Sequence, residues 1–426
     1  MFHSMKQLFA PTNKDLRQRI LFTLGALMIF VIGTSIRVPG TDEITSNLGF
    51  LELMNAMGGG GLKNFSIFAL GVMPYITASI IMQLLQLDIV PYFSELNKEG
   101  PVGRQKINQI TRYMGIIFAF IEGFAFSFVF FNASSAMEHL YIATILTAGT
   151  AFTLWLGDQI TQKGIGNGMS LIIMAGIIKE LPTMFVLAFQ GLVLKSSLDL
   201  WLGILLFIAF TIVYFLIIIG VIWVQEADRK IPIQYANKST SAYGGNQSFM
   251  PIKINSAGVV PVIFASSFLM IPSTIAQFTG KQGFINFCNN YLSYNTVVGF
   301  LIYVFLIFFF GYFYTFIQIK PEELSKNLQQ NGGFIPGVRP GKETENYVSK
   351  VLSRLTVVGS IFLIIIAGLP ILFTALVNIS DKVSLSSQVT IGGTGLLIVV
   401  GVALETYKQL EGSLVTRSYE KSYRRK

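Results

Sequence analysis

Ten long apolar runs recur along the chain, and no other feature of the sequence limits the possible folds as strongly. An α-helix needs roughly 20 mostly apolar residues to cross a bilayer, because every backbone polar group must be satisfied inside the lipid. Only 12% of the residues are charged, whereas a soluble domain carries roughly 25%. We therefore expect an all-α polytopic membrane protein with ten transmembrane helices. The runs cover about residues 20–36, 72–87, 110–131, 142–156, 169–189, 198–224, 257–278, 297–319, 355–377 and 391–407.

The positions of Lys and Arg predict the orientation, because short cytosolic loops of membrane proteins are enriched in these residues. With the N-terminus placed in the cytosol, 25 of the 31 basic residues fall in cytosolic segments and four fall on the opposite side. This distribution predicts that both termini are cytosolic. Two cytosolic loops, 225–256 and 320–354, are long and basic. They suggest a docking surface, although the same charges could serve only to set the orientation.

The ten spans divide into two halves of five, residues 1–190 and 191–426. Because five is an odd number, the second half must enter the membrane upside down relative to the first. This inverted-repeat arrangement is typical of proteins that hold a site at the interface between their halves. No clear sequence repeat accompanies it, so the expected symmetry rests on the topology alone.

Four consecutive glycines, 58–61, interrupt the pattern of simple spans just before the second apolar run. A short stretch, 62–70, follows them, and Gly71 then precedes the uncharged run 72–87. A helix of these 16 residues is roughly 24 Å long, which is too short for a full span. The deficit favours a re-entrant piece above an aqueous cavity. A surface loop followed by an ordinary short helix is the alternative, and this stretch alone leaves both open.

The apolar runs offer little that could support catalysis, metal binding or ion coupling. Glycine-rich segments at 164–168 and 392–395 resemble phosphate-binding turns, but neither follows a strand. We therefore expect no enzyme, no metal site and no cofactor, and an ion-coupled carrier of a small solute is disfavoured. A hydrophobic constriction that dewets can close an aqueous path without charged groups. The few candidate ionisable or metal-binding residues are Glu122, Lys179, Glu180, Glu405, His3, His139 and Cys288.

Eight sequence blocks resemble the SecY family of protein-conducting channels. They occur in the same order as in that family and extend over nearly the whole chain. A single glycine motif would be weak support, but eight blocks at the expected topological positions are specific. The blocks are NFSIFALGVMPYITASIIMQLL (64–85), EGPVGRQKINQITRY (99–113), WLGDQITQKGIGNGMSLIIMAGI (155–177), RKIPIQYA (229–236), PIKINSAGVVPVIFASS (251–267), NGGFIPGVRPGKET (331–344), RLTVVGSIFL (354–363) and IGGTGLLIVVGVALE (391–405).

The resemblance implies a role for four sets of residues. It implies a short plug helix at about 61–70, comprising Gly61, Leu62, Asn64, Phe65, Ser66, Ile67, Phe68, Ala69 and Leu70. It implies a pore ring of Val72, Ile76, Ile173, Ile263 and Ile398. It places a lateral gate between helices 2 and 3 on one side and 7 and 8 on the other, with Thr77, Ser79 and Gln83 as a polar stripe. It assigns the docking of the motor ATPase SecA and of the ribosome to Arg229, Lys230, Arg339 and Lys342.

The resemblance also implies a function and partners. Such a channel passes unfolded secretory polypeptides across the bacterial cell membrane and releases hydrophobic segments sideways into lipid. The implied partners are the small subunits SecE and SecG, the motor ATPase SecA, signal sequences and nascent chains, membrane lipids, and the ribosome, whose RNA phosphates a basic loop could contact. Departures such as Val31, Gln105 and Asp158 leave open an accessory channel for restricted substrates. A secondary transporter and a structural scaffold are the alternatives from other classes.

Overall fold

The computed structural model describes residues 14–41, 52–86, 90–131, 135–194, 199–235, 248–279, 281–293, 296–378 and 387–424, and they are mostly helical. Within these ranges, seven helical segments are long and apolar enough to cross a membrane. They include α2 (Lys14–Gly33), α6 (Pro101–Phe130), α7 (Ala136–Lys163), α8 (Gly168–Phe189), α9 (Leu200–Glu226), α12 (Val297–Gln318) and α14 (Lys342–Asn378).

The three remaining apolar runs also lie in helices, which confirms the all-α membrane fold. Helix α4 (Met73–Leu85) holds the second run, α10 (Val260–Thr279) the seventh, and α15 (Ser387–Arg424) the tenth. Shorter helical elements connect them. These are α3 (Glu52–Met57), α5 (Pro91–Lys98), α11 (Gln282–Phe287), α13 (Pro321–Gln330) and two π-helical turns, Gln190–Leu194 and Cys288–Leu292.

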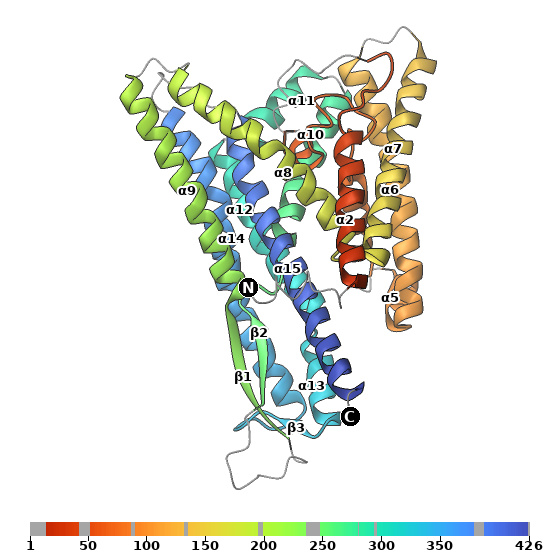
Figure 1. Cartoon of the computed structure of the whole chain (residues 1–426), viewed down its shortest axis with the longest axis vertical. Helices are drawn as coiled ribbons and strands as arrows, with labels where there is room; N and C mark the ends of the chain where they lie inside the picture. Colours follow the sequence, from red (N-terminus) through yellow and green to blue (C-terminus); the bar gives the residue numbers. More distant parts are fainter. Residues whose placement is uncertain are drawn as a thin grey trace.

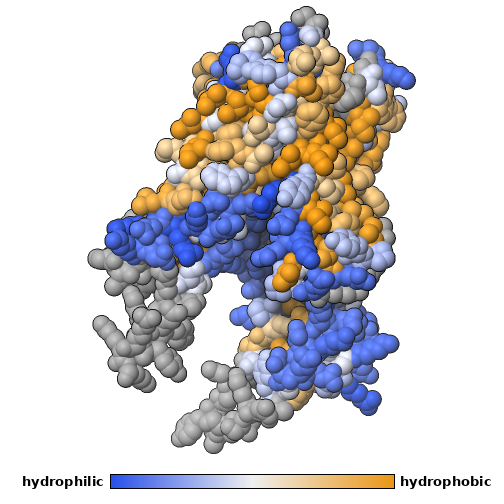
Figure 2. Space-filling model, turned by 90° about the vertical axis from the view of Figure 1, so that its right-hand side faces the viewer, coloured by the Kyte–Doolittle hydropathy of each residue, from blue (hydrophilic) through white to orange (hydrophobic). Residues whose placement is uncertain are grey.

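The helices form two groups that meet along α8 and α15. Figure 1 shows α2, α5, α6 and α7 on one side and α9, α12 and α14 on the other, with α8 and α15 between them. One continuous apolar core runs through both groups. Figure 2 shows a broad apolar band, with hydrophilic side chains gathered toward one end and a hollow between two hydrophilic parts of that end.

A small sheet joins the two long polar loops into one unit, which sequence patterns did not predict. Strands β1 (Asp228–Tyr235) and β2 (Ser248–Lys253) form an antiparallel hairpin, and β3 (Gly333–Phe334) pairs with the far end of β1. The sheet unit, defined as β1–β3, α13 and residues 335–352, projects from one end of the helices (Figure 1). It has an apolar core of its own, formed by Ile231, Ile252, Ile335, Val348 and Leu352.

The glycine-rich stretch is buried, so the surface-loop alternative is wrong. Residues 58–72, named the re-entrant turn, form consecutive turns, and the short helix of this region is α3, which ends just before the glycines. The helix expected at 61–70 is therefore misplaced. Left-handed backbone at Gly59, Gly60 and Gly71 and at Phe65 (φ 44°) explains the difference, because a right-handed helix cannot accommodate such residues.

The structure also reveals a repeat that we did not detect in the sequence. Gly71 and Gly258 are both left-handed, and each lies two residues before the helix that carries the second span of its half. Aligned on these glycines, residues 71–79 read GVMPYITAS and residues 258–266 read GVVPVIFAS. The repeat is short and surrounded by divergent sequence, so only the equivalent position of the two turns makes it visible.

Candidate functional site

Backbone hydrogen bonds hold the re-entrant turn against the segment that follows α2. The amide of Val38 donates to the carbonyl of Phe65 at 3.0 Å, and the amide of Ile67 donates to Ile36 at 2.9 Å. The buried side chain of Asn55 accepts the amide of Lys63 at 2.8 Å. Irregular backbone inside a membrane protein must have such partners, because lipid supplies none.

Glycines on three surrounding helices form the seat of this turn. Gly149 on α7 faces the carbonyl of Ile67 so closely that a Cβ would overlap it, and Gly33 on α2 makes room for the ring of Phe68. On α8, Gly176 contacts the backbone of Met57 and Gly59. A side chain at any of these positions would displace the turn. The expected plug residues accordingly lie buried, except for Asn64 and Ile67, which are partly buried.

The five expected pore-ring residues belong to one apolar region. Val72, Ile76, Ile173 and Ile398 are buried in the main core, and Ile263 packs against it while remaining partly exposed. Three of them, Ile173, Ile263 and Ile398, line a cavity of about 230 Å³ that lies on the side of the sheet unit. Val72 and Ile76 do not line it.

Helix α8 shows where this apolar region lies relative to the cavity and the re-entrant turn. Ser170 and Ile173 line the cavity, Gly176 contacts Gly59, and Glu180 lies against Gly60. The six-residue step from Ser170 to Gly176 corresponds to roughly 9 Å of helix. A thin apolar layer therefore separates a polar cavity from a buried turn. The polar part of the cavity lining includes Gln225, Lys253, Asn255, Gln318, Glu405 and Lys408.

Side-chain caps set the start of α8 and hence the depth of Ile173. Asn167 Oδ1 accepts the amide of Met169 at 3.1 Å, and Thr161 Oγ1 accepts the amide of Gly168 at 2.9 Å. The glycine-rich 164–168 segment is thus a helix-capping turn. Ile177, one helical turn beyond Ile173, is buried in the same core and contacts Gly395 of α15. We missed it as a candidate, although its four-residue spacing from Ile173 places it on the same helix face.

The polar stripe expected on α4 is only partly assembled into a common site. Thr77 Oγ1 donates to the carbonyl of Met73 at 3.3 Å, and Gln83 Nε2 lies 3.4 Å from Ser79 Oγ. Ser79 and Gln83 line a cavity of about 590 Å³ together with α12, whereas Thr77 does not. Contacts between α10 and the pair α4 and α6 are sparse compared with those inside either group. The boundary between α10 and the pair α4 and α6 is therefore sparsely packed.

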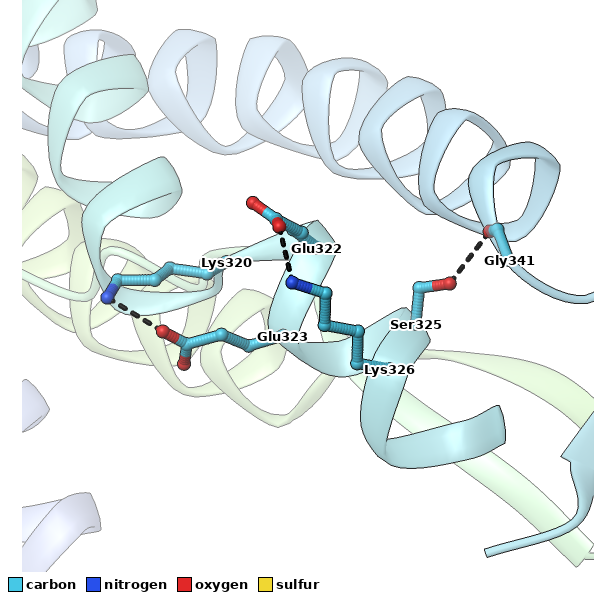
Figure 3. Close-up of polar contacts among 6 residues, drawn as sticks. All are labelled: Lys320, Glu322, Glu323, Ser325, Lys326 and Gly341. Carbon is cyan, nitrogen blue, oxygen red and sulfur yellow. Dashed lines mark hydrogen bonds and ion pairs between the residues drawn. The ribbon is translucent and has the colours of Figure 1, made fainter. Parts of the chain in front are cut away.

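The four expected docking residues are exposed on the sheet unit. Arg229 and Lys230 lie on β1, and Arg339 and Lys342 lie at the turn that leads into α14. Two side-chain hydrogen bonds help to hold this turn. Thr344 Oγ1 donates to the carbonyl of Arg339 at 2.9 Å. Ser325 Oγ of α13 donates to the carbonyl of Gly341 at 2.8 Å (Figure 3).

Two lysines, one just before α13 and one within it, form ion pairs with glutamates of this helix. Lys326 Nζ lies 2.6 Å from Glu322 Oε1, and Lys320 Nζ lies 2.9 Å from Glu323 Oε1 (Figure 3). Among the residues that the structure describes, no cluster of three or more His, Cys, Asp or Glu side chains is arranged to hold a metal.

Comparison with known proteins gives a consistent result. A profile of the SecY family matches residues 66–407. The protein translocase subunit SecY of Staphylococcus carnosus (strain TM300) is 47% identical over 434 residues and covers 99% of both chains. Its counterpart in Staphylococcus aureus (strain NCTC 8325 / PS 47) is 47% identical over 422 residues, or 96% of both.

Solved structures agree at the level of the fold. A protein-conducting channel superposes with a TM-score of 0.66 at 20% identity and covers 94% of this chain and 93% of its own. Sec61 in a canine ribosome-channel complex gives a TM-score of 0.63 at 18% identity, with the same coverage of 94% and 93%. The family profile and the two staphylococcal relatives show that the chain belongs to the SecY family.

Proposed function

We propose that this protein is the channel subunit of a protein translocase. It conducts unfolded secretory polypeptides across the membrane and releases hydrophobic segments sideways into the bilayer. The observation that carries the proposal is the layered arrangement on α8. A polar cavity, a thin apolar layer at Ile173 and a buried turn at Gly59 follow one another along a single helix.

An apolar layer of this kind suits a path that must stay closed to ions and still pass any sequence. A hydrophobic constriction excludes water while it is narrow, because the side chains cannot replace the hydrogen bonds that water would lose. It opens around a polypeptide without requiring a specific partner. Val72, Ile76, Ile173, Ile263 and Ile398, named the constriction residues, would close the path, and the re-entrant turn would cover it as a plug.

The sparsely packed boundary between α10 and the pair α4 and α6 would be the lateral gate. A hydrophobic segment in the path could leave through it, since burial of apolar surface in lipid is favourable by roughly 25 cal/mol per Å². Thr77, Ser79 and Gln83 would give this wall the polar character that lets it part. The protein would itself be no enzyme, and a motor or the ribosome would drive transport.

The relatives and the charge distribution support the remaining assignments. We place both termini and the sheet unit in the cytosol of a bacterial cell, where Arg229, Lys230, Arg339 and Lys342 would meet the motor SecA and the ribosome. SecE and SecG would be the companion subunits. Contacts of the basic loops with ribosomal RNA would be mainly to phosphate and would weaken with salt.

Reconstituted vesicles test the proposed function directly. We expect Ile173→Asn and Ile263→Asn to raise the ion conductance of the resting channel and to allow export of proteins with defective signal sequences. Burying the Asn amide away from water without hydrogen-bond partners costs roughly 1–3 kcal/mol. The fraction of channels whose constriction is filled with water should therefore rise on the order of tenfold.

The matched control is Ile178→Asn, the same substitution at an exposed position on α8. In this variant, the resting ion conductance and the rejection of defective signal sequences should stay near the values of the unchanged protein. If the Ile173 and Ile263 variants leak no more than the Ile178 variant, these residues do not close the path. A protein that fails to pass a secretory precursor with its partners present would contradict the function itself.

A further inference from the structure

A second turn lies on the opposite side of the constriction from the re-entrant turn. Residues 254–259, named the second turn, connect β2 to α10, and all of them except Ile254 line the cavity of about 230 Å³. The amide of Ile254 donates to Ala227 at 3.0 Å, and Asn255 Nδ2 donates to the carbonyl of Gly258 at 3.0 Å. The turn is therefore held firmly at the mouth of the cavity.

The short repeat makes the two turns equivalent residue by residue. Aligning Gly71 with Gly258 pairs Ile76 with Ile263, which are both constriction residues, and pairs Val72 with Val259. A second repeat relates α8 to α15, where GMSLIIMAGIIKE (168–180) matches GTGLLIVVGVALE (393–405). It pairs Ile173 with Ile398, the remaining two constriction residues.

Packing follows the same correspondence, so the repeat is structural as well as sequential. The carbonyl of Ile67 meets Gly149 on α7, and the carbonyl of its counterpart Ile254 lies 2.9 Å from the place where Gly359 on α14 would carry a Cβ. Gly149 begins the sequence GTAF, and Gly359 begins the matching GSIF. Each half thus uses a glycine of its fourth span to seat the turn before its second span.

The fifth span of each half repeats the pattern. Gly176 on α8 contacts the re-entrant turn, and its counterpart Gly401 on α15 faces Val259, whose Cγ1 lies 2.7 Å from the place of a Cβ at Gly401. Glu180 lies against the re-entrant turn at Gly60, and its counterpart Glu405 lines the cavity beside the second turn. Each fifth span therefore places a glycine against the turn region of its own half, although Gly176 meets Met57 and Gly59 and Gly401 meets the later residue Val259.

The constriction residues form two complete pairs and one incomplete pair under this symmetry. Ile76 pairs with Ile263 and Ile173 with Ile398, whereas Val72 has no assigned partner. We propose that Val259 is the missing member. It forms the cytosolic edge of the constriction, one helical turn before Ile263, and contacts the extended polypeptide as the chain enters. This proposal rests on the proposed channel function and adds a residue to its path.

The two valines differ in what covers them, and the difference is measurable. Val72, the last residue of the re-entrant turn, is 2% exposed, whereas Val259 is partly buried and borders the open cavity. In the resting channel, a reagent added from the cytosolic side should therefore reach position 259 and should not reach position 72.

Single-cysteine variants test this placement in the intact translocase. In a Cys288→Ser background, which removes the native cysteine, we expect a membrane-impermeant maleimide to label the Val259→Cys variant in inverted vesicles and to leave Val72→Cys unlabelled. An arrested precursor that carries one cysteine should form a disulfide with the Val259→Cys and Ile263→Cys variants. Phe268→Cys, at an exposed position on α10, is the control that should not react with the precursor.

The crosslinks separate failure of this proposal from failure of the proposed function. A precursor that reacts with Ile263→Cys and never with Val259→Cys overturns the role of Val259 and leaves the channel function standing. A precursor that reacts with neither overturns both. Labelling of Val259→Cys no faster than Val72→Cys also contradicts the placement of Val259 at the open edge.

A compensation experiment tests the contact between Gly401 and Val259 on which the placement of Val259 rests. Gly401→Ala pushes a methyl group against Val259 and should slow precursor translocation roughly fivefold by narrowing the entry. The double variant Gly401→Ala/Val259→Ala should return the rate to within about twofold of the unchanged protein, because the shorter side chain relieves the contact. Gly25→Ala, on α2 with no atom within 4 Å of the added methyl, should have no effect. A double variant that stays as slow as Gly401→Ala overturns the proposal.

Discussion

At the scale of single residues, glycine decides how closely the helices can approach the re-entrant turn. Gly33, Gly149 and Gly176 lie on three different helices, and each faces atoms of α3 or the turn where a Cβ would stand. Aromatic packing adds to this seat, because Phe68 stacks between Phe30 and Phe152 at centroid distances of 6.0 and 5.7 Å. The position of the re-entrant turn therefore depends on small residues that hydropathy alone treats as ordinary parts of a span.

Gly149→Ala tests the seat of the turn. The added methyl group would overlap the carbonyl of Ile67, and overpacking of this kind costs roughly 1–3 kcal/mol. If the cost falls on the closed state, resting ion conductance should rise on the order of tenfold in single-channel recordings. Gly25→Ala, where the methyl group meets open space, is the control. Equal conductance in the two variants would show that this contact does not hold the channel closed.

At the scale of elements, α4 packs mainly against α6 and makes few contacts with α10. A Cβ at Gly115 of α6 would lie 3.1 Å from the Cα of Tyr75, and a small apolar cluster of Met82, Leu96 and Ile107 joins α4, α5 and α6. Arg112 and Asp158 tie α6 to α7 with an ion pair at 2.7 Å. Opening between α4 and α10 should therefore leave α4, α6 and α7 together as one body.

Disulfide crosslinking tests this division. In the Cys288→Ser background, Thr77→Cys paired in turn with cysteines at Phe264 and Ser267 of α10 should yield at least one variant that oxidises readily. Export by that variant should stop on oxidation and return on reduction, because the boundary can no longer open. A cysteine pair across Gly115 and Tyr75 should crosslink without stopping export. Export that continues through a crosslinked α4–α10 pair would place the gate elsewhere.

At the scale of the whole molecule, the sheet unit joins two loops that are distant in the sequence into one projection. The pairing of Gln234 with Phe334 joins them, and a separate apolar core supports the joint. The chain carries a formal net charge of +9, and the exposed arginines and lysines of this unit present part of that charge at one end of the molecule. Under the proposed function, this unit is where a motor that pushes polypeptide would bind.

Arg339→Glu tests the docking role. The side chain is exposed while its backbone is held by Thr344, so charge reversal should leave the fold intact and abolish SecA-driven export in vesicles. Lys326→Gln is the matched control, because the Lys326 ammonium is engaged with Glu322 within α13. Binding of SecA, measured by sedimentation with the vesicles, should fall in parallel with export. Normal export by the Arg339→Glu protein would remove this residue from the docking surface.

The sequence by itself determined the ten apolar spans, the all-α fold and the family, because transfer of a helix into lipid depends on local composition. It also located the buried segment at the glycine run and named Ile173, Ile263 and Ile398, which the structure brings to one cavity. Only the tertiary structure decided that 61–70 forms turns instead of a helix, that β1 pairs with β3, and that Val259 is the counterpart of Val72. Each of these depends on partners far along the chain: a glycine on a facing helix, a strand from another loop, or an equivalent turn in the other half. Local hydropathy carries no information about such partners, so they become visible only when the spans are packed together.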